Sequence, residues 1–155
     1  MVRFLLLLAV FTGILNSECA AQILDDAELA FQSSCENQRP VLIVFAGSDW
    51  CAPCIRFERK VFTQKEFADF ASQKIVVYEA DFPQRKKLSK STRQKNDDLA
   101  EQYNPKGTFP YFVLVRPDRS VITALMYDDE SVQAFINKIS THLEDEQAKN
   151  VQKTN

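Results

Sequence analysis

The sequence has little glycine, histidine or cysteine, and it has no large excess of charge of either sign. Its 155 residues include three glycines, one histidine and four cysteines. The 19 lysines and arginines nearly balance the 21 aspartates and glutamates, which argues against a protein that binds nucleic acid. Beyond residue 21 no apolar run is long enough to span a bilayer. The chain also lacks an Asn-x-Ser/Thr acceptor and a retention tetrapeptide of the endoplasmic reticulum, which favours a bacterial periplasm over a eukaryotic lumen.

Residues 1–21 are typical of a secretory signal peptide. Arg3 precedes a short apolar run, and small residues close the segment, so we expect cleavage after Ala21. The alternative is a lipoprotein signal acylated at Cys19, to which Glu18 is a poor fit. We therefore prefer an exported, periplasmic protein over one that is lipid-anchored through Cys19, and we expect no integral membrane segment after cleavage.

The stretch 50–54, Trp-Cys-Ala-Pro-Cys, carries the obvious chemistry of the chain. The apolar block 41–45 before it predicts a buried strand, and residues 55–60 after it predict a helix. A sulfur at the start of a helix meets unpaired N–H groups and the positive end of the helix dipole, so a thiolate is favoured there. We expect Cys51 to be the exposed nucleophile that attacks a disulfide and Cys54 to be the more buried cysteine that resolves the mixed disulfide.

The remaining pattern predicts one α/β domain over residues 22–143, followed by a polar tail, 144–155, that frays. Residues 25–38 predict a helix with Cys35 buried on its apolar stripe, rather than serving as a third redox thiol. Thr63 and Glu66, three residues apart, predict a capping box at the start of the next helix. A strand at 75–80 should then pair in parallel with the first, through a βαβ unit.

Farther along, residues 84–98 carry six cations and little apolar content, so we expect either a polar insertion or a helix extension that bears charge. For the role of the cations we prefer a solvated loop to a surface that steers an acidic partner. A short helix is expected at 98–103. An antiparallel hairpin follows, with strands at 111–115 and 120–126. Asp128 or Asp129 should cap the final helix.

This order of elements, with Trp50-Cys51-Ala52-Pro53-Cys54 and Thr108-Phe109-Pro110 at the right separation, resembles a thioredoxin fold, a central mixed β-sheet flanked by helices. Within that superfamily the chain resembles exported bacterial members and the soluble C-terminal domain of the periplasmic disulfide-reductant transporter. The resemblance implies a cis peptide between Phe109 and Pro110, facing the dithiol and pairing with a bound substrate strand, with Trp50, Ala52 and Pro53 beside it.

One departure concerns the buried acid that thioredoxins place in the strand before the motif to pass protons to the resolving cysteine. The corresponding positions here are Val44 and Phe45, and the nearby acids Asp49 and Glu58 are expected to be exposed. The sequence therefore identifies no residue that passes protons to Cys54.

Together these features predict an exported, monomeric thiol-disulfide oxidoreductase, without cofactor or metal, that exchanges disulfides with protein partners and is recharged by an upstream redox partner. We favour a reductase or isomerase over a disulfide-donating oxidase. Two other classes stay open, a soft-metal (copper) handling protein and a non-catalytic peptide-docking module. The metal class lacks ligands near the motif, because Met126 and His142 lie elsewhere in the sequence.

Overall fold

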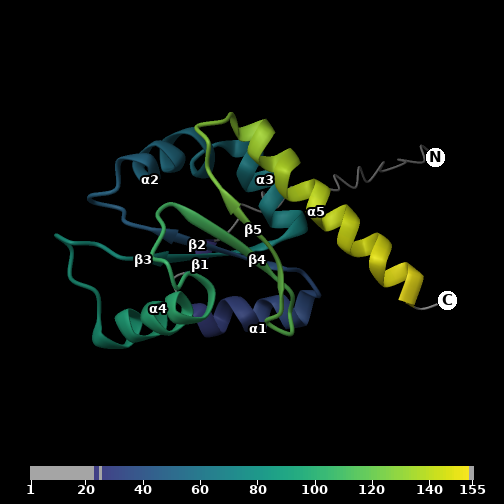
Figure 1. Ribbon diagram of the computed structural model, residues 1–155, viewed down its shortest axis with the longest axis horizontal. Coiled ribbons are helices and arrows are strands. Elements are labelled where there is room, and N and C mark those ends of the chain that lie inside the picture. The colour runs from purple at the N-terminus through teal and green to yellow at the C-terminus, as the bar shows by residue number, and fades with distance from the viewer. Residues whose placement is uncertain (1–22, 25, 154–155) are drawn as a thin grey trace, which may run out of the picture.

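The computed structural model describes residues 23–24 and 26–153, which fold as a five-stranded sheet with helices on both faces (Figure 1). The predicted signal peptide and Cys19 lie outside these residues. The elements in chain order are β1 (Ile23–Leu24), α1 (Ala27–Asn37), β2 (Val41–Ala46), α2 (Ala52–Phe57), the π-helical turn η1 (Glu58–Phe62), α3 (Lys65–Lys74), β3 (Val76–Asp81), α4 (Lys90–Tyr103), β4 (Tyr111–Val115), β5 (Val121–Met126) and α5 (Val132–Lys153).

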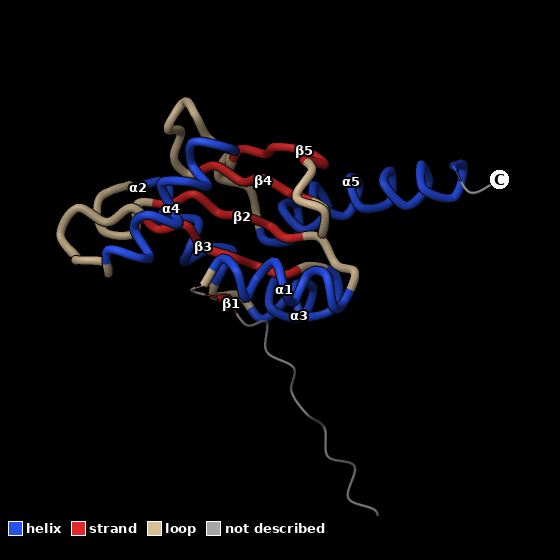
Figure 2. The backbone as a smooth tube through the Cα atoms, turned by 90° about the horizontal axis from the view of Figure 1, so that it is seen from below, coloured by secondary structure: helices blue, strands red, loops and turns tan. Residues whose placement is uncertain are grey.

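The strands lie in the order β1-β3-β2-β4-β5, which Figure 2 shows edge to edge. β2 pairs in parallel with β3, as the βαβ pattern predicts, and antiparallel with β4. All six residues of β2 are buried, because helices cover both faces of the sheet at its centre. The predicted thioredoxin-like architecture with a mixed sheet is confirmed.

Two hydrophobic clusters occupy the two faces, and alternate residues of β2 feed each of them. α2, η1, α3 and α5 pack over Leu42 and Val44. α1 and α4 pack on the other side, over Ile43 and Phe45. This alternation decides which β2 and β3 side chains face the active-site helix.

Cys35 is exposed, so the prediction of a buried core cysteine is wrong. The buried face of α1 includes Ala27, Phe31 and Ser34. At 3.6 residues per turn, position i+8 is rotated about 80° from position i, whereas i+7 is rotated only about 20°. Ser34 therefore takes the inward position, and its hydroxyl donates to the Arg39 carbonyl at 2.5 Å.

The predicted capping box is also absent. Helix α2 continues directly into η1, and the Thr63 hydroxyl donates back to the Arg59 carbonyl at 3.2 Å. Gln64 occupies the N-cap of α3 without a side-chain hydrogen bond, so Thr63 caps nothing.

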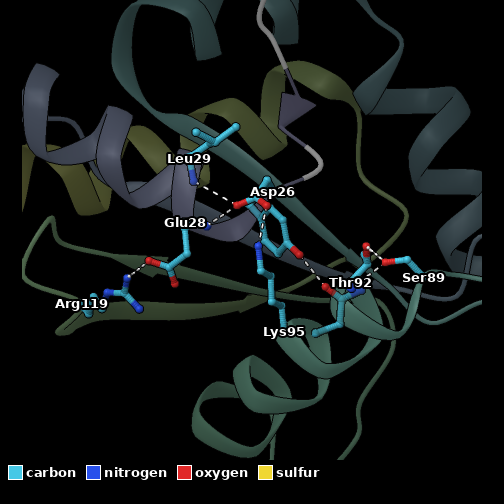
Figure 3. Close-up of polar contacts among 9 residues, drawn as sticks. Asp26, Glu28, Leu29, Ser89, Thr92, Lys95 and Arg119 are labelled. Atoms are coloured by element: carbon cyan, nitrogen blue, oxygen red, sulfur yellow. Dashed lines mark hydrogen bonds and ion pairs between the residues drawn. The ribbon is translucent and has the colours of Figure 1, made fainter.

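The polar insertion is only partly a loop, because its second half belongs to α4. Ser89 caps this helix by accepting from the Thr92 N–H at 3.0 Å, and Lys95 pairs with Asp26, the N-cap of α1, at 2.5 Å (Figure 3). Leu99 and the rest of its buried face hold the helix on the sheet. The short helix predicted at 98–103 is thus the last part of a longer one.

The final helix begins after Ser131, whose hydroxyl accepts from the Ala134 N–H at 3.3 Å, so neither Asp128 nor Asp129 is its cap. Rather than fraying at residue 144, α5 continues to Lys153 and extends past the sheet (Figures 1 and 2). The Arg116 guanidinium makes two contacts with the Glu146 carboxylate, at 2.6 and 2.7 Å, which tie the extension to β4.

Candidate active site

Cys51 and Cys54 form a disulfide at the start of α2, with their Cα atoms 5.2 Å apart. Cys51 is the N-cap of the helix, and its sulfur accepts from the Cys54 N–H at 3.2 Å. Pro53 lies in the first turn, where its missing N–H leaves no bond unmade. The helix start therefore presents a hydrogen-bond donor to Cys51, as the pattern predicts.

The expectation that Cys51 is exposed is wrong for this disulfide form, whereas Cys54 is buried as predicted. The two residues are 5% and 4% exposed. Both sulfurs are tied to the first turn of α2, and both residues belong to the hydrophobic cluster beneath it. Cys51 therefore has little contact with solvent in the disulfide form.

Three aromatic residues, Trp50, Phe82 and Phe109, contact one another next to the dithiol motif, to which Trp50 belongs, and are called here the aromatic rim. The Trp50 indole N–H donates to the Phe82 carbonyl at 2.7 Å, and the Phe109 ring meets each of the other two rings edge-on at 5.5 Å between centroids. A Cβ at Gly47 would overlap the Trp50 ring, so glycine allows the indole to pack directly against the backbone there. Trp50 remains 39% exposed, available to a bound chain.

The peptide bond between Phe109 and Pro110 is cis, as the family resemblance implies. Asn104 holds the preceding loop: its side-chain N–H donates to the Thr108 carbonyl at 2.9 Å, and its oxygen accepts from the Thr108 N–H at 3.0 Å. Pro110 is buried and Phe109 half-buried. Sequence reasoning overlooked Asn104, a buried polar residue 3% exposed.

Beneath the disulfide lies a cavity of about 330 Å³ whose lining includes Cys54, Pro110, Glu58 and Glu79. Glu79 lies on β3, directly beside Val44 of β2. Val44 is one of the two positions at which the resemblance to thioredoxins implies a buried acid, so here an acid stands on the neighbouring strand instead. Burial, followed by repulsion from Glu58 and Asp81, raises the pKa of Glu79 to about 7.

Glu79 is the functional candidate that sequence reasoning missed. Its signal was a charged residue within an apolar strand, Val76–Asp81, but only the pairing of β3 with β2 places it opposite Val44. Glu58 is exposed as expected, and partial desolvation raises its pKa.

Asp49 is half-buried rather than exposed as expected, because its carboxylate binds the backbone of a neighbouring loop instead of facing solvent. Its carboxylate accepts the backbone N–H groups of Gln84, Arg85 and Lys86 at 2.7 to 3.0 Å. These bonds, the one from Gln84 first, lower the pKa of Asp49 and keep it ionised. Asp81 acts similarly on the motif turn, accepting from the Ser48 N–H and hydroxyl at 2.9 and 2.7 Å.

A larger cavity of about 500 Å³ lies at the opposite end of the sheet, between α3, α5 and the β4–β5 turn. It contains no cysteine, so the redox chemistry belongs to the smaller cavity. Within residues 23–24 and 26–153, no group of three potential ligands could hold a metal ion, and no helix is long and apolar enough to cross a membrane.

Known proteins resemble this chain in both sequence and structure. A disulfide bond reductase of Chlamydia pneumoniae, DsbH, is 30% identical over 114 residues, which are 74% of this chain and 68% of that protein. A solved DsbH oxidoreductase structure superposes with a TM-score of 0.74 at 28% identity, covering 81% of this chain and 88% of that one. The reduced C-terminal domain of Neisseria meningitidis DsbD shares the fold, with a TM-score of 0.56 at 19% identity over 74% of this chain and 92% of that one. The sequence model of a family described as thioredoxin-like matches residues 22–117, and the chain therefore belongs to the thioredoxin-like family.

Proposed function

We propose that this thiol-disulfide oxidoreductase works as a reductase or isomerase on disulfides of exported proteins, with Cys51 as the attacking thiol. The observation that carries the assignment is the Cys51–Cys54 disulfide at the start of α2, where the Cys54 N–H already points at the Cys51 sulfur. The same contact stabilises a Cys51 thiolate once the pair is reduced. The export pattern of residues 1–21 and the likeness to a disulfide bond reductase support this setting.

The reaction begins with the reduced pair. The Cys51 thiolate attacks one sulfur of the partner's disulfide, that S–S bond breaks, and the other partner sulfur leaves as a thiolate that takes up a proton. The Cys54 thiol then loses its proton and attacks the Cys51 sulfur, releasing the second partner thiol. Two electrons pass to the partner, and Cys51 and Cys54 end as a disulfide that an upstream dithiol must reduce again.

Glu79 takes the proton from Cys54 in this scheme. Both side chains line the same cavity, and a carboxyl with a pKa of about 7 accepts and returns protons near neutral pH. The position beside Val44 supports the idea that β3 supplies the acid that β2 lacks.

The substrate chain is bound in extended form against the loop before β4. Backbone groups next to the cis Phe109–Pro110 bond offer it hydrogen bonds, while Trp50, Ala52 and Pro53 border it on the other side. Ala52 is exposed, so a partner backbone can approach the motif closely there.

A trapping experiment tests the mechanism. In a Cys35→Ala background, Cys54→Ser should accumulate a mixed disulfide with a disulfide-bonded peptide on Cys51, detected by intact mass, and Cys51→Ser should form none. No adduct in the Cys54→Ser protein would contradict the proposal. The direction of electron transfer is tested by the reduction potential of the Cys51/Cys54 pair. A value of about −270 mV supports a reductase, whereas a value of about −120 mV makes the chain a disulfide donor.

A further inference from the structure

The connection between β3 and α4 is anchored by hydrogen bonds at both of its ends, beside the active site. Its first part is fixed by Asp49, which accepts three consecutive backbone N–H groups from Gln84 to Lys86. Its last part is fixed by Ser89, the cap of α4 (Figure 3). Since Asp49 directly precedes Trp50 in the chain, the loop and the dithiol motif are joined at one point. Figure 1 shows the loop at the same end of the sheet as the start of α2.

This loop presents concentrated positive charge. Arg85, Lys86 and Lys87 are exposed and consecutive, and no acidic residue occurs between Asp81 and Asp97. Within the part of the chain that the structure describes, none of the three forms an ion pair. Arg56 and Lys60, on the dithiol helix and the turn after it, are by contrast both paired with Asp129. The Asp49 carboxylate thus binds the backbone of the loop, and the charges of Arg85 and Lys86 act on Asp49 and Glu79 only from beyond ion-pair distance.

The charge adjoins the aromatic rim and the cavity. Phe82, whose carbonyl binds Trp50, lies three residues before Arg85, and Lys86 lines the cavity that contains Cys54. A chain bound against the rim would therefore carry its neighbouring residues past Arg85 and Lys87. Unpaired cations at such a place favour carboxylates and speed their encounter.

We propose that the loop 84–87 is a docking site for an acidic segment of the partner protein, adjacent to the disulfide being exchanged. The proposal rests on the proposed function, because it names the kind of substrate that the dithiol receives. A polypeptide is favoured over an anionic membrane because the charges border the rim and the disulfide. The acidic segment and the cysteine can then be held at the same time.

The test measures kcat/KM for two synthetic peptides with the same disulfide, one flanked by glutamates and one by lysines. The wild-type protein should prefer the acidic peptide by about 3-fold or more at low ionic strength, with the preference shrinking as salt is added. Arg85→Gln/Lys87→Gln should lose most of this preference. Lys86 is kept, because its charge acts on Glu79. The matched control, Lys74→Gln/Lys149→Gln, removes the same charge away from the dithiol and should retain the preference.

Bis(2-hydroxyethyl) disulfide, which is uncharged, separates the two proposals. If both variants and the wild type reduce it equally, but the wild type does not prefer the acidic peptide, the docking site is refuted while the proposed function stands. If the wild type reduces no disulfide and Cys54→Ser traps no peptide, the proposed function itself fails. A third outcome would also overturn the proposal. If the wild type sediments with phosphatidylglycerol vesicles, the Arg85→Gln/Lys87→Gln variant does not, and the wild type shows no peptide preference, the loop binds a membrane surface.

Discussion

Replacing Glu79 by glutamine should stabilise the protein at neutral and alkaline pH. The pKa of Glu79 is raised from its ordinary 4.5 to about 7, so the folded state binds a proton more tightly than the unfolded state does. Stability from this group is fully present below about pH 4.5 and is lost as the pH rises through 7. At 1.36 kcal/mol per pKa unit, the loss is at most about 3 kcal/mol. Glutamine has a similar shape and no charge, so Glu79→Gln should avoid this loss.

The assay is urea unfolding of the disulfide form at several values from about pH 5 to 8, with Cys35→Ala in both proteins to prevent thiol exchange. The difference in unfolding free energy between Glu79→Gln and the parent should grow with pH and level off above about pH 7. Glu66→Gln, at an exposed carboxyl on α3, controls for the general loss of a negative charge. A difference that stays constant over this range would refute the assignment of Glu79 as a half-buried carboxyl with a raised pKa.

Three further substitutions address the core and the substrate face. Phe57→Ala should lower the unfolding free energy by about 3–5 kcal/mol, because the residue is 2% exposed and its ring packs against four others at 4.6 to 5.2 Å between centroids. A loss under about 1 kcal/mol would contradict that packing. Gly47→Ala should displace Trp50 and shift the fluorescence of the single tryptophan, while an unchanged spectrum would show that the ring tolerates a Cβ. Asn104→Ala should lower the unfolding free energy by about 1–3 kcal/mol, because two hydrogen bonds to Thr108 are lost. It should also raise KM for peptide disulfides more than KM for bis(2-hydroxyethyl) disulfide. Equal effects on both substrates would argue against a role in positioning the loop.

Local sequence was sufficient for most elements, because each carries its own pattern. The apolar block before the motif predicts β2, and the proline at the first turn agrees with the start of α2. The sequence predictions were wrong where two local signals compete. Cys35 and Ser34 both fit an apolar stripe on α1, and only packing against the sheet selects Ser34. Thr63 satisfies the capping pattern, yet α2 continues into η1 and the Thr63 hydroxyl donates to the Arg59 carbonyl of that turn instead.

The kind of chemistry was readable from the sequence. Two cysteines three residues apart at a strand-to-helix turn, within the order of elements of a thioredoxin fold, predict a redox pair. The environment of that pair became clear only from the folded chain, because it depends on residues that are distant in sequence. The parallel register of β2 and β3 places Glu79 beside Val44, and the contact of Asp49 with residues 84–86 brings a basic loop to the dithiol. Strand register and loop anchoring arise from the packing of the whole domain, so no short stretch of sequence encodes them.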